Sequence, residues 1–115
     1  MISIYGIKNC DTMKKAFRWL DEHNVEYQFF DYKKVGVDAE LATQWLAQQD
    51  WQTLINKRGT TWRKLDDNTK DTMNNSNALA VMMAQPSIIK RPLIIKDDAI
   101  ILGFNAEDYE RQFLS

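Results

Sequence analysis

The chain contains one cysteine and one histidine, and this scarcity excludes several kinds of site. A single cysteine cannot form a disulfide within the chain, and one cysteine with one histidine cannot supply the soft ligands of a zinc site. We therefore expect no disulfide framework and no bound metal. Because secreted domains seldom keep a single free thiol, we also expect a cytoplasmic protein.

Glycine and long apolar runs are scarce as well. Only four glycines occur in 115 residues, and none forms the glycine-rich loop of a nucleotide site. No apolar run approaches the roughly 20 residues that cross a membrane. The first six residues also lack the cationic start of a signal peptide. We expect neither a membrane-spanning nor a targeting segment.

The charges are balanced, with 15 Lys and Arg against 16 Asp and Glu. Without an overall positive field, the protein is not expected to bind nucleic acid directly or to attach to an anionic membrane. The composition, 44% hydrophobic and 27% charged, is that of an ordinary globular protein. The length predicts a single domain over residues 1–115.

The N-terminal third predicts a strand, a helix and a second strand. Ile2, Ile4 and Ile7 indicate a short buried strand that enters a loop at Gly6. A helix follows, with Asp11 or Thr12 as its cap and an end near residues 23–24. Residues 25–30 alternate apolar and polar side chains and predict the second strand. Such a βαβ unit pairs its two strands in parallel.

The middle of the chain, about residues 35–85, predicts a helical insertion. Asp38 can cap one helix, and Pro86 ends a nearly all-apolar one. Residues 57–63 predict a basic loop. After the insertion, two β-branched runs at 93–95 and 99–102 predict a hairpin, and Asn105 can cap a last helix. This order, βαβ, helical insertion, ββα, is that of an α/β thioredoxin-like fold with a four-stranded mixed sheet.

Cys10 is the predicted nucleophile because it lies where the first strand gives way to the first helix. The N–H groups of a helix's first turn lack partners within the helix, and together with the helix dipole they stabilise a nearby negative charge. A cysteine in this position is more readily a thiolate, the form that attacks sulfur and other electrophiles. The alternative is a small buried side chain without chemistry.

Arginines are the second group of candidates. Arg91 precedes Pro92, and an X-Pro bond directly before a central strand of such a fold is a candidate for the cis form. This bend is expected to present Arg91 beside the Cys10 loop. Arg58, flanked by further cations at 57 and 63, could bind a carboxylate or an oxyanion. For each arginine, a solvated surface charge is the alternative.

Two cysteine chemistries are excluded by single positions. A cysteine phosphatase loop needs an arginine six residues after the nucleophile, where this chain has Ala16. A two-cysteine redox motif needs a thiol at the position of Met13. With one cysteine, any disulfide that Cys10 forms must be resolved by an external thiol.

Three segments together resemble the arsenate reductase-like ArsC family, and most closely its YffB branch, which is related to the Spx/MgsR regulators. The segments are Gly6-Ile7-Lys8-Asn9-Cys10-Asp11-Thr12-Met13-Lys14-Lys15-Ala16, Pro86-Ser87-Ile88-Ile89-Lys90-Arg91-Pro92-Leu93-Ile94, and Gly103-Phe104. The resemblance implies a catalytic Cys10 and oxyanion-binding arginines at 58 and 91. We expect Asn9, Asp11 and Thr12, beside Cys10, to contact glutathione or the substrate.

The resemblance implies a glutathione-dependent thiol reductase, with glutathione as co-substrate and glutaredoxin as a further partner. A first alternative is a glutathione- and glutaredoxin-linked arsenate reductase. Those enzymes carry a third arginine after the last strand, where this chain has Leu102-Gly103-Phe104-Asn105. A second alternative is an Spx-like regulator that binds RNA polymerase without catalysis, although Spx proteins often carry the CxxC pair that Met13 interrupts here.

Overall fold

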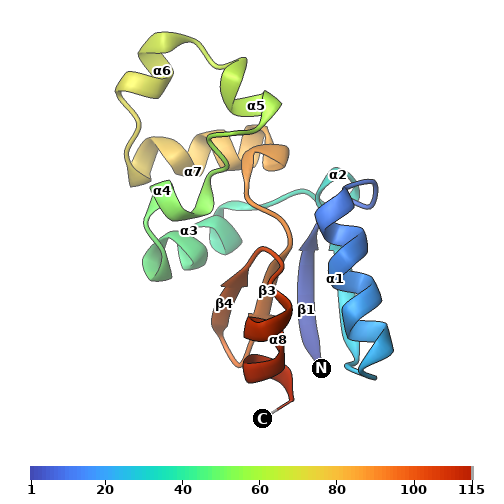
Figure 1. Cartoon of the computed structure of the whole chain (residues 1–115). Helices are drawn as coiled ribbons and strands as arrows, with labels where there is room; N and C mark the ends of the chain where they lie inside the picture. Colours follow the sequence, from blue (N-terminus) through green and yellow to red (C-terminus); the bar gives the residue numbers. More distant parts are fainter. Residues whose placement is uncertain (115) are drawn as a thin grey trace. The chain divides into compact units, whose positions relative to one another are not determined.

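The computed structural model describes residues 1–114, which group into two compact units (Figure 1). Unit 1 joins Met1–Asp31 to the C-terminal part of the chain that begins at Arg91, and unit 2 is Tyr32–Lys90. The helical insertion predicted at about 35–85 therefore runs from residue 32 to residue 90. No helix in the described part of the chain is long and apolar enough to cross a membrane.

Unit 1 is built on a four-stranded sheet in the order β2-β1-β3-β4. The strands are β1 (Ile2–Gly6), β2 (Tyr27–Asp31), β3 (Leu93–Lys96) and β4 (Ala99–Leu102). β1 pairs in parallel with β2 and antiparallel with β3, and β3 pairs antiparallel with β4. This confirms the predicted mixed sheet. The β3–β4 hairpin turns at Asp97 and Asp98, whose φ angles of 49° and 70° are those of a tight type I′ connection.

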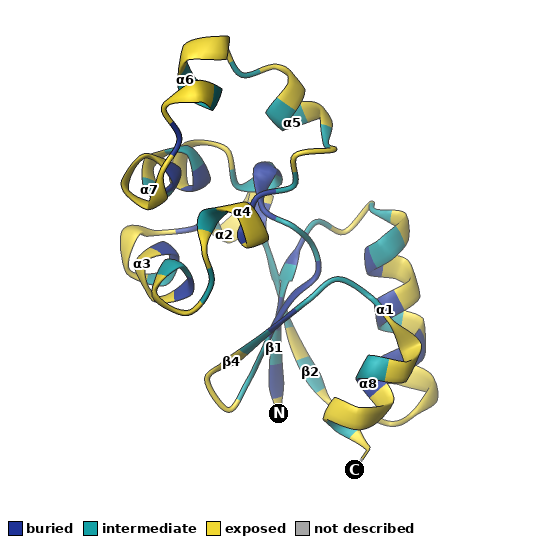
Figure 2. Ribbon diagram, turned by 60° about the vertical axis from the view of Figure 1, so that its left-hand side comes forward, coloured by how far each residue is buried: buried dark blue, intermediate teal, exposed yellow. Residues whose placement is uncertain are grey.

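Two helices cover one face of this sheet, α1 (Asp11–Glu22) and α8 (Ala106–Phe113) (Figure 2). α1 is amphipathic, and its apolar stripe is buried. The indole of Trp19 meets the ring of Tyr109 edge to face, with 5.4 Å between the ring centroids. These contacts join α1, α8 and the sheet into one core, which comprises Ile2, Ile4, Met13, Ala16, Trp19, Leu20, Ile94, Ile101 and Tyr109.

The ends of α1 correct one prediction and confirm another. The N-cap is Cys10 itself, not Asp11 or Thr12, because Cys10 is extended and its carbonyl already accepts the first helical hydrogen bond, from Lys14 at 3.0 Å. The helix therefore begins at Asp11, one residue earlier than a cap at Asp11 would allow and two residues earlier than a cap at Thr12 would allow. At the other end, α1 stops at Glu22 as predicted, and Asn24 adopts a left-handed φ of 56°.

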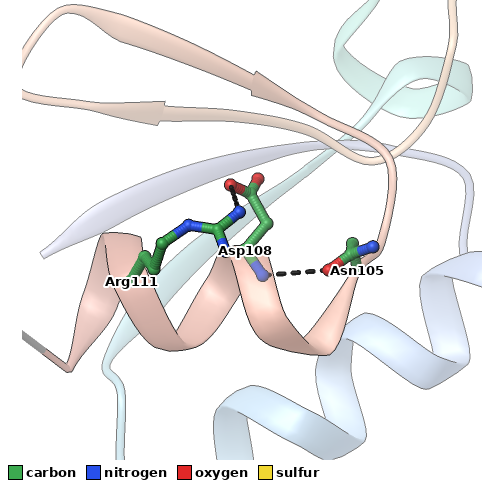
Figure 3. Close-up of polar contacts among 3 residues, drawn as sticks. All are labelled: Asn105, Asp108 and Arg111. Atoms are coloured by element: carbon green, nitrogen blue, oxygen red, sulfur yellow. Dashed lines mark hydrogen bonds and ion pairs between the residues drawn. The ribbon is translucent and has the colours of Figure 1, made fainter.

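The last helix begins as the sequence predicts. The side chain of Asn105 accepts a hydrogen bond from the backbone N–H of Asp108 at 2.9 Å, which satisfies one of the free donors of the first turn (Figure 3). The Asp108 carboxylate also pairs with the Arg111 guanidinium at 3.2 Å, one turn along the exposed face. Asn105 thus fixes where the chain leaves β4 and enters α8.

Unit 2 is helical. Its elements are α2 (Tyr32–Val35), α3 (Ala39–Gln48), α4 (Trp51–Leu54), α5 (Thr60–Arg63), α6 (Asp67–Asp71), α7 (Asn75–Ala84) and the 3-10 helix η1 (Pro86–Ile88). Asp38 caps α3 as predicted, by accepting from the Leu41 N–H at 2.9 Å. The predicted basic loop is partly wrong, because residues 60–63 form the helical turn α5, whose N-cap is Gly59.

The core of unit 2 lies mainly between α3 and α7, where Trp45 and Met82 are almost completely buried. An antiparallel bridge between Ile55 and Ile89 closes this unit near its end. The Lys57 ammonium group lies 4.7 Å from the centroid of the Trp51 ring. One cation of the basic segment at 57–63 thus forms a cation–π contact within unit 2.

Candidate functional site: Cys10 and Arg91

Cys10 is the half-buried N-cap of α1, four residues after β1 ends at Gly6. Its thiol is free, and its side chain packs against the edge of the unit 1 core. The alternation of β1 and the apolar stripe of α1 fix both neighbouring elements, so the sequence places Cys10 at their junction. The thiol is accessible to a reaction partner, and the backbone of Cys10 is fixed by the helix that begins directly after it.

The close approach of α1 to β1 depends on Gly6. A Cβ atom at Gly6 would lie 2.5 Å from Sδ and 2.7 Å from Cε of Met13, and 3.5 Å from Cβ of Arg91. Met13 is completely buried, so its sulfur has little room to move. Glycine is therefore required here by contact, and it lets the first turn of α1 and the segment before β3 come together at the end of β1.

Arg91 belongs to this same end of the sheet. The Arg91–Pro92 peptide bond is cis, and the Pro92 carbonyl accepts a hydrogen bond from Gly103 N–H at 2.9 Å, which ties the segment to the chain after β4. Pro92 is buried, whereas Arg91 is half-buried. From this position the Arg91 side chain hydrogen-bonds the sulfur of Cys10. The pairing of β3 with β1 brings these two distant segments together.

The surroundings of Cys10 favour its thiolate. Partial burial is the largest single effect and raises the pKa of the thiol, because it removes water from the charged form. The opposing effects together exceed it: hydrogen bonds from the Met13 and Thr12 N–H groups, and a hydrogen bond and positive charge from Arg91. The pKa of Cys10 is therefore lowered from its ordinary value. A larger fraction of this thiol is nucleophilic near neutral pH than in a free cysteine.

The remaining predicted site residues fall into two groups. Asn9 and Asp11 are exposed on either side of Cys10, and Thr12 is half-buried with its N–H directed to the sulfur. Arg58 belongs to unit 2, where its side chain is exposed. Its backbone N–H donates a hydrogen bond to Oδ1 of Asn56 at 3.1 Å. The structure thus brings Arg91 and Thr12 to Cys10, and the anion-binding role of Arg58 stays a prediction.

One feature beside the thiol was missed by the sequence analysis. A surface pocket of about 380 Å³ is lined by Lys8, Asn9, Lys14, Phe17, Tyr27 and Phe29. Its residues come from the loop before Cys10, from α1 and from β2, all within unit 1. The alternating aromatics of residues 27–30 and the lysines around Cys10 were visible in the sequence. Their convergence was not, because it depends on how α1 lies across β2.

The arrangement can perform nucleophilic substitution at sulfur. Cys10 supplies a thiolate, and Arg91 with the first-turn N–H groups stabilises negative charge on it and on an anion bound beside it. Across residues 1–114, no three His, Cys, Asp or Glu side chains are grouped so that they could hold a metal ion.

The parallel β1–β2 pair, the antiparallel hairpin, the cis bond before β3 and a cysteine at the start of α1 together define a thioredoxin-like protein with a helical insertion. Comparison with known families makes this more specific. The chain belongs to the ArsC family, whose model matches residues 5–112.

Solved structures and curated relatives agree with this assignment. A structure of a YffB protein is 48% identical, with a TM-score of 0.92 over 96% of this chain and 97% of the other. An arsenate reductase-related protein from Brucella melitensis is 46% identical, with a TM-score of 0.80 over 97% of this chain and 93% of that chain. The global transcriptional regulator Spx 1 of Oceanobacillus iheyensis is 27% identical over 99% of this chain and 87% of its own length.

Proposed function

We propose that this protein is a glutathione-dependent thiol–disulfide reductase that uses Cys10 as its single nucleophile. The observation that carries the proposal is the position of Cys10 at the start of α1, where its sulfur accepts hydrogen bonds from the Met13 and Thr12 N–H groups and from Arg91. These contacts lower the pKa of Cys10 in spite of partial burial. Membership of the arsenate reductase-like ArsC family supports a reductase. A free thiol of this kind fits a reducing compartment, so we place the activity in the cytoplasm.

The proposed reaction has two exchange steps. The Cys10 thiolate attacks the glutathione sulfur of a mixed disulfide R–S–SG, so that a Cys10–SG bond forms, the S–S bond of the mixed disulfide breaks, and R–S⁻ leaves and takes up a proton. A glutathione thiolate then attacks the glutathione sulfur of the Cys10–SG disulfide. Oxidised glutathione forms and the Cys10 thiolate returns. The substrate gains two electrons, and two glutathione moieties end as one disulfide.

The residues around Cys10 have separate roles in this scheme. Arg91 stabilises the thiolate as attacking and as leaving group, and Thr12 does so through its N–H. Asn9 and Asp11 are exposed beside the sulfur and are the proposed polar contacts of glutathione. Arg58 is a further proposed ligand for a carboxylate, and a raised KM for glutathione in Arg58→Ala is the expected sign of that role. Glutaredoxin is the proposed protein partner where a second thiol carrier is needed.

Arsenate reduction is the first alternative. The position after β4, where the glutathione-linked arsenate reductases carry a third arginine, holds Phe104. Its ring meets Tyr109 edge to face at 5.0 Å between centroids and packs against the core of unit 1. An aromatic core contact cannot bind an oxyanion, so this position argues against arsenate as the substrate. Arsenate-dependent NADPH oxidation, coupled through glutathione and glutaredoxin, is the assay that distinguishes the two.

The deciding experiment measures turnover of a glutathionylated peptide in the presence of glutathione, glutathione reductase and NADPH. Wild-type protein should raise NADPH consumption above the rate measured without protein, and Cys10→Ser should remove this increase because serine is not ionised at neutral pH. Lys64→Ala, an exposed change in unit 2, serves as the control and should keep the wild-type rate. Mass spectrometry should detect the Cys10–glutathione adduct when glutathione reductase is omitted. Full activity of Cys10→Ser would refute the proposal.

A non-enzymatic regulator is the second alternative, and the similarity to Spx 1 over nearly the whole chain favours keeping it. Such a protein would bind RNA polymerase through its surface and would need no thiol chemistry. Retention of RNA polymerase on immobilised protein, equal for wild type and Cys10→Ser and accompanied by no disulfide turnover, would favour this function over the reductase.

A further inference from the structure

The pocket lined by Lys8, Asn9, Lys14, Phe17, Tyr27 and Phe29, here called the aromatic pocket, has apolar walls and a positive rim. The Phe17 ring stacks on Tyr27 with 5.4 Å between centroids and meets Phe29 edge to face at 5.1 Å. All three rings are half-buried. The Tyr27 hydroxyl donates a hydrogen bond to the Asp21 carboxylate, so the ring of Tyr27 is the part available to a ligand in the aromatic pocket.

The rim supplies the polar contacts. Lys8 and Lys14 are exposed, and within residues 1–114 neither ammonium group forms an ion pair. No Asp or Glu lines the aromatic pocket. A ligand that matches these walls and this rim has an apolar body and a carboxylate, because lysines that have no acidic partner pair readily with an incoming carboxylate.

The aromatic pocket adjoins the nucleophile. Asn9 directly precedes Cys10, and the Lys14 N–H bonds to the Cys10 carbonyl at 3.0 Å. Cys10 itself does not line the aromatic pocket. The group that fills it is therefore separated from the reacting sulfur by several bonds, as a side chain next to a cysteine in a peptide is. Glutathione has carboxylates but no apolar side chain, so it lacks the part that the walls would hold.

On the basis of the proposed reductase function, we propose that the aromatic pocket selects the other half of the disulfide. It binds the aromatic or large aliphatic side chain of a residue next to the reacting cysteine of a polypeptide, and Lys8 and Lys14 bind an acidic residue beside it. The substrates of this protein are then glutathionylated polypeptides with an apolar and an acidic residue at the modified cysteine.

Peptides that differ in these two features test the proposal. Glutathionylated peptides with Glu-Phe, Glu-Ala and Lys-Phe before the cysteine, and the same pairs after it, are compared by kcat/KM. Of the two Glu-Phe peptides, the one with the higher kcat/KM marks the preferred side of the cysteine. We expect its kcat/KM to be about tenfold higher than that of the Glu-Ala and Lys-Phe peptides with the same order, which is the effect of one good apolar or ionic contact. Each rate is divided by the rate with hydroxyethyl disulfide, which has neither feature. Equal values for all peptides would overturn the proposal.

Matched charge reversals assign the preference to the aromatic pocket. Lys14→Glu should invert the order of the Glu-Phe and Lys-Phe peptides, because it reverses the charge at the rim. Lys15→Glu places the same charge on the adjacent, exposed position of α1 outside the aromatic pocket, and it should leave the order and the hydroxyethyl disulfide rate unchanged. An inversion by both variants would show a general charge effect and would contradict a role for this pocket.

A binding measurement separates this proposal from the reductase proposal. Cys10→Ser protein is titrated with the unmodified Glu-Phe peptide that has serine for cysteine, and amide shifts are followed by NMR. Shifts at Phe17, Tyr27 and Phe29 that weaken with the Lys-Phe peptide support the aromatic pocket even if no disulfide is turned over. Turnover without such shifts would sustain the reductase and refute the pocket's role.

Discussion

Arg91, the first residue of the cis Arg91–Pro92 peptide before β3, hydrogen-bonds the sulfur of Cys10 at the start of α1. The contact joins two segments that are far apart in the sequence at one end of the central strands β1 and β3. It is the interaction by which a side chain, rather than the helix itself, favours the thiolate.

Replacing Arg91 with alanine should raise the pKa of Cys10, because both the hydrogen bond and the positive charge of Arg91 are lost. The alkylation rate by iodoacetamide at neutral pH should fall roughly tenfold, since a cation at hydrogen-bond distance changes the acidity of a thiol by about that factor. Arg91→Lys keeps the charge and should lose less. A pH profile of alkylation that is the same in Arg91→Ala and wild type would contradict this role of Arg91.

The stability of the fold should depend on pH through Cys10. The pKa of its thiol is lower in the folded protein than in the unfolded chain, so between these two values the unfolded chain binds more protons and folding becomes more favourable as pH rises. This contribution is fully present above the unfolded pKa of about 8.5 and is lost as pH falls through the folded pKa.

Urea unfolding of wild type and Cys10→Ser, under reducing conditions from about pH 6 to about pH 9, measures this contribution as a difference. Serine is a good N-cap and can shift the stability by a constant amount. The prediction therefore concerns the pH dependence. The free energy of unfolding of wild type, relative to that of Cys10→Ser, should increase as pH rises. A difference that does not change with pH would show that Cys10 titrates alike in both states.

Gly6→Ala should destabilise the protein by about 1–3 kcal/mol, the usual cost of adding a methyl group to a filled core. The new Cβ would lie 2.5 Å from the buried Sδ of Met13. Met13→Ala removes the atom that is struck, so Gly6→Ala should cost much less in that background. The free energy of unfolding of the two single variants and the double variant tests this coupling. Additive costs would place the strain elsewhere.

Asn105→Ala should lower the free energy of unfolding by about 1 kcal/mol, since it removes the oxygen that accepts from the Asp108 N–H. Asn105→Asp retains an acceptor and should be close to wild type. Arg111→Ala removes the exposed ion pair with Asp108 at the same helix, and its effect should stay within about 0.5 kcal/mol. Thermal or urea unfolding of the three variants ranks the contributions, and an equal loss in Asn105→Ala and Arg111→Ala would contradict the capping role.

The sequence alone determined most of the elements and the position of the cysteine between two of them. The strands, the apolar stripe of α1, the Asp38 and Asn105 caps and the tight hairpin follow from periodicity and turn chemistry that act over a few neighbouring residues. The start of α1 was predicted one or two residues too late, because Cys10 is not a residue type that commonly caps helices.

The surroundings of the thiol depend on contacts between segments that are distant in the sequence. The contact of Arg91 with Cys10 requires β3 to pair beside β1, and the contact of Gly6 with Met13 requires α1 to lie close against the sheet. The aromatic pocket likewise depends on the packing of α1 across β2. Such contacts join residues far apart in sequence, and the register and packing that create them are set by the whole core and not by any local pattern.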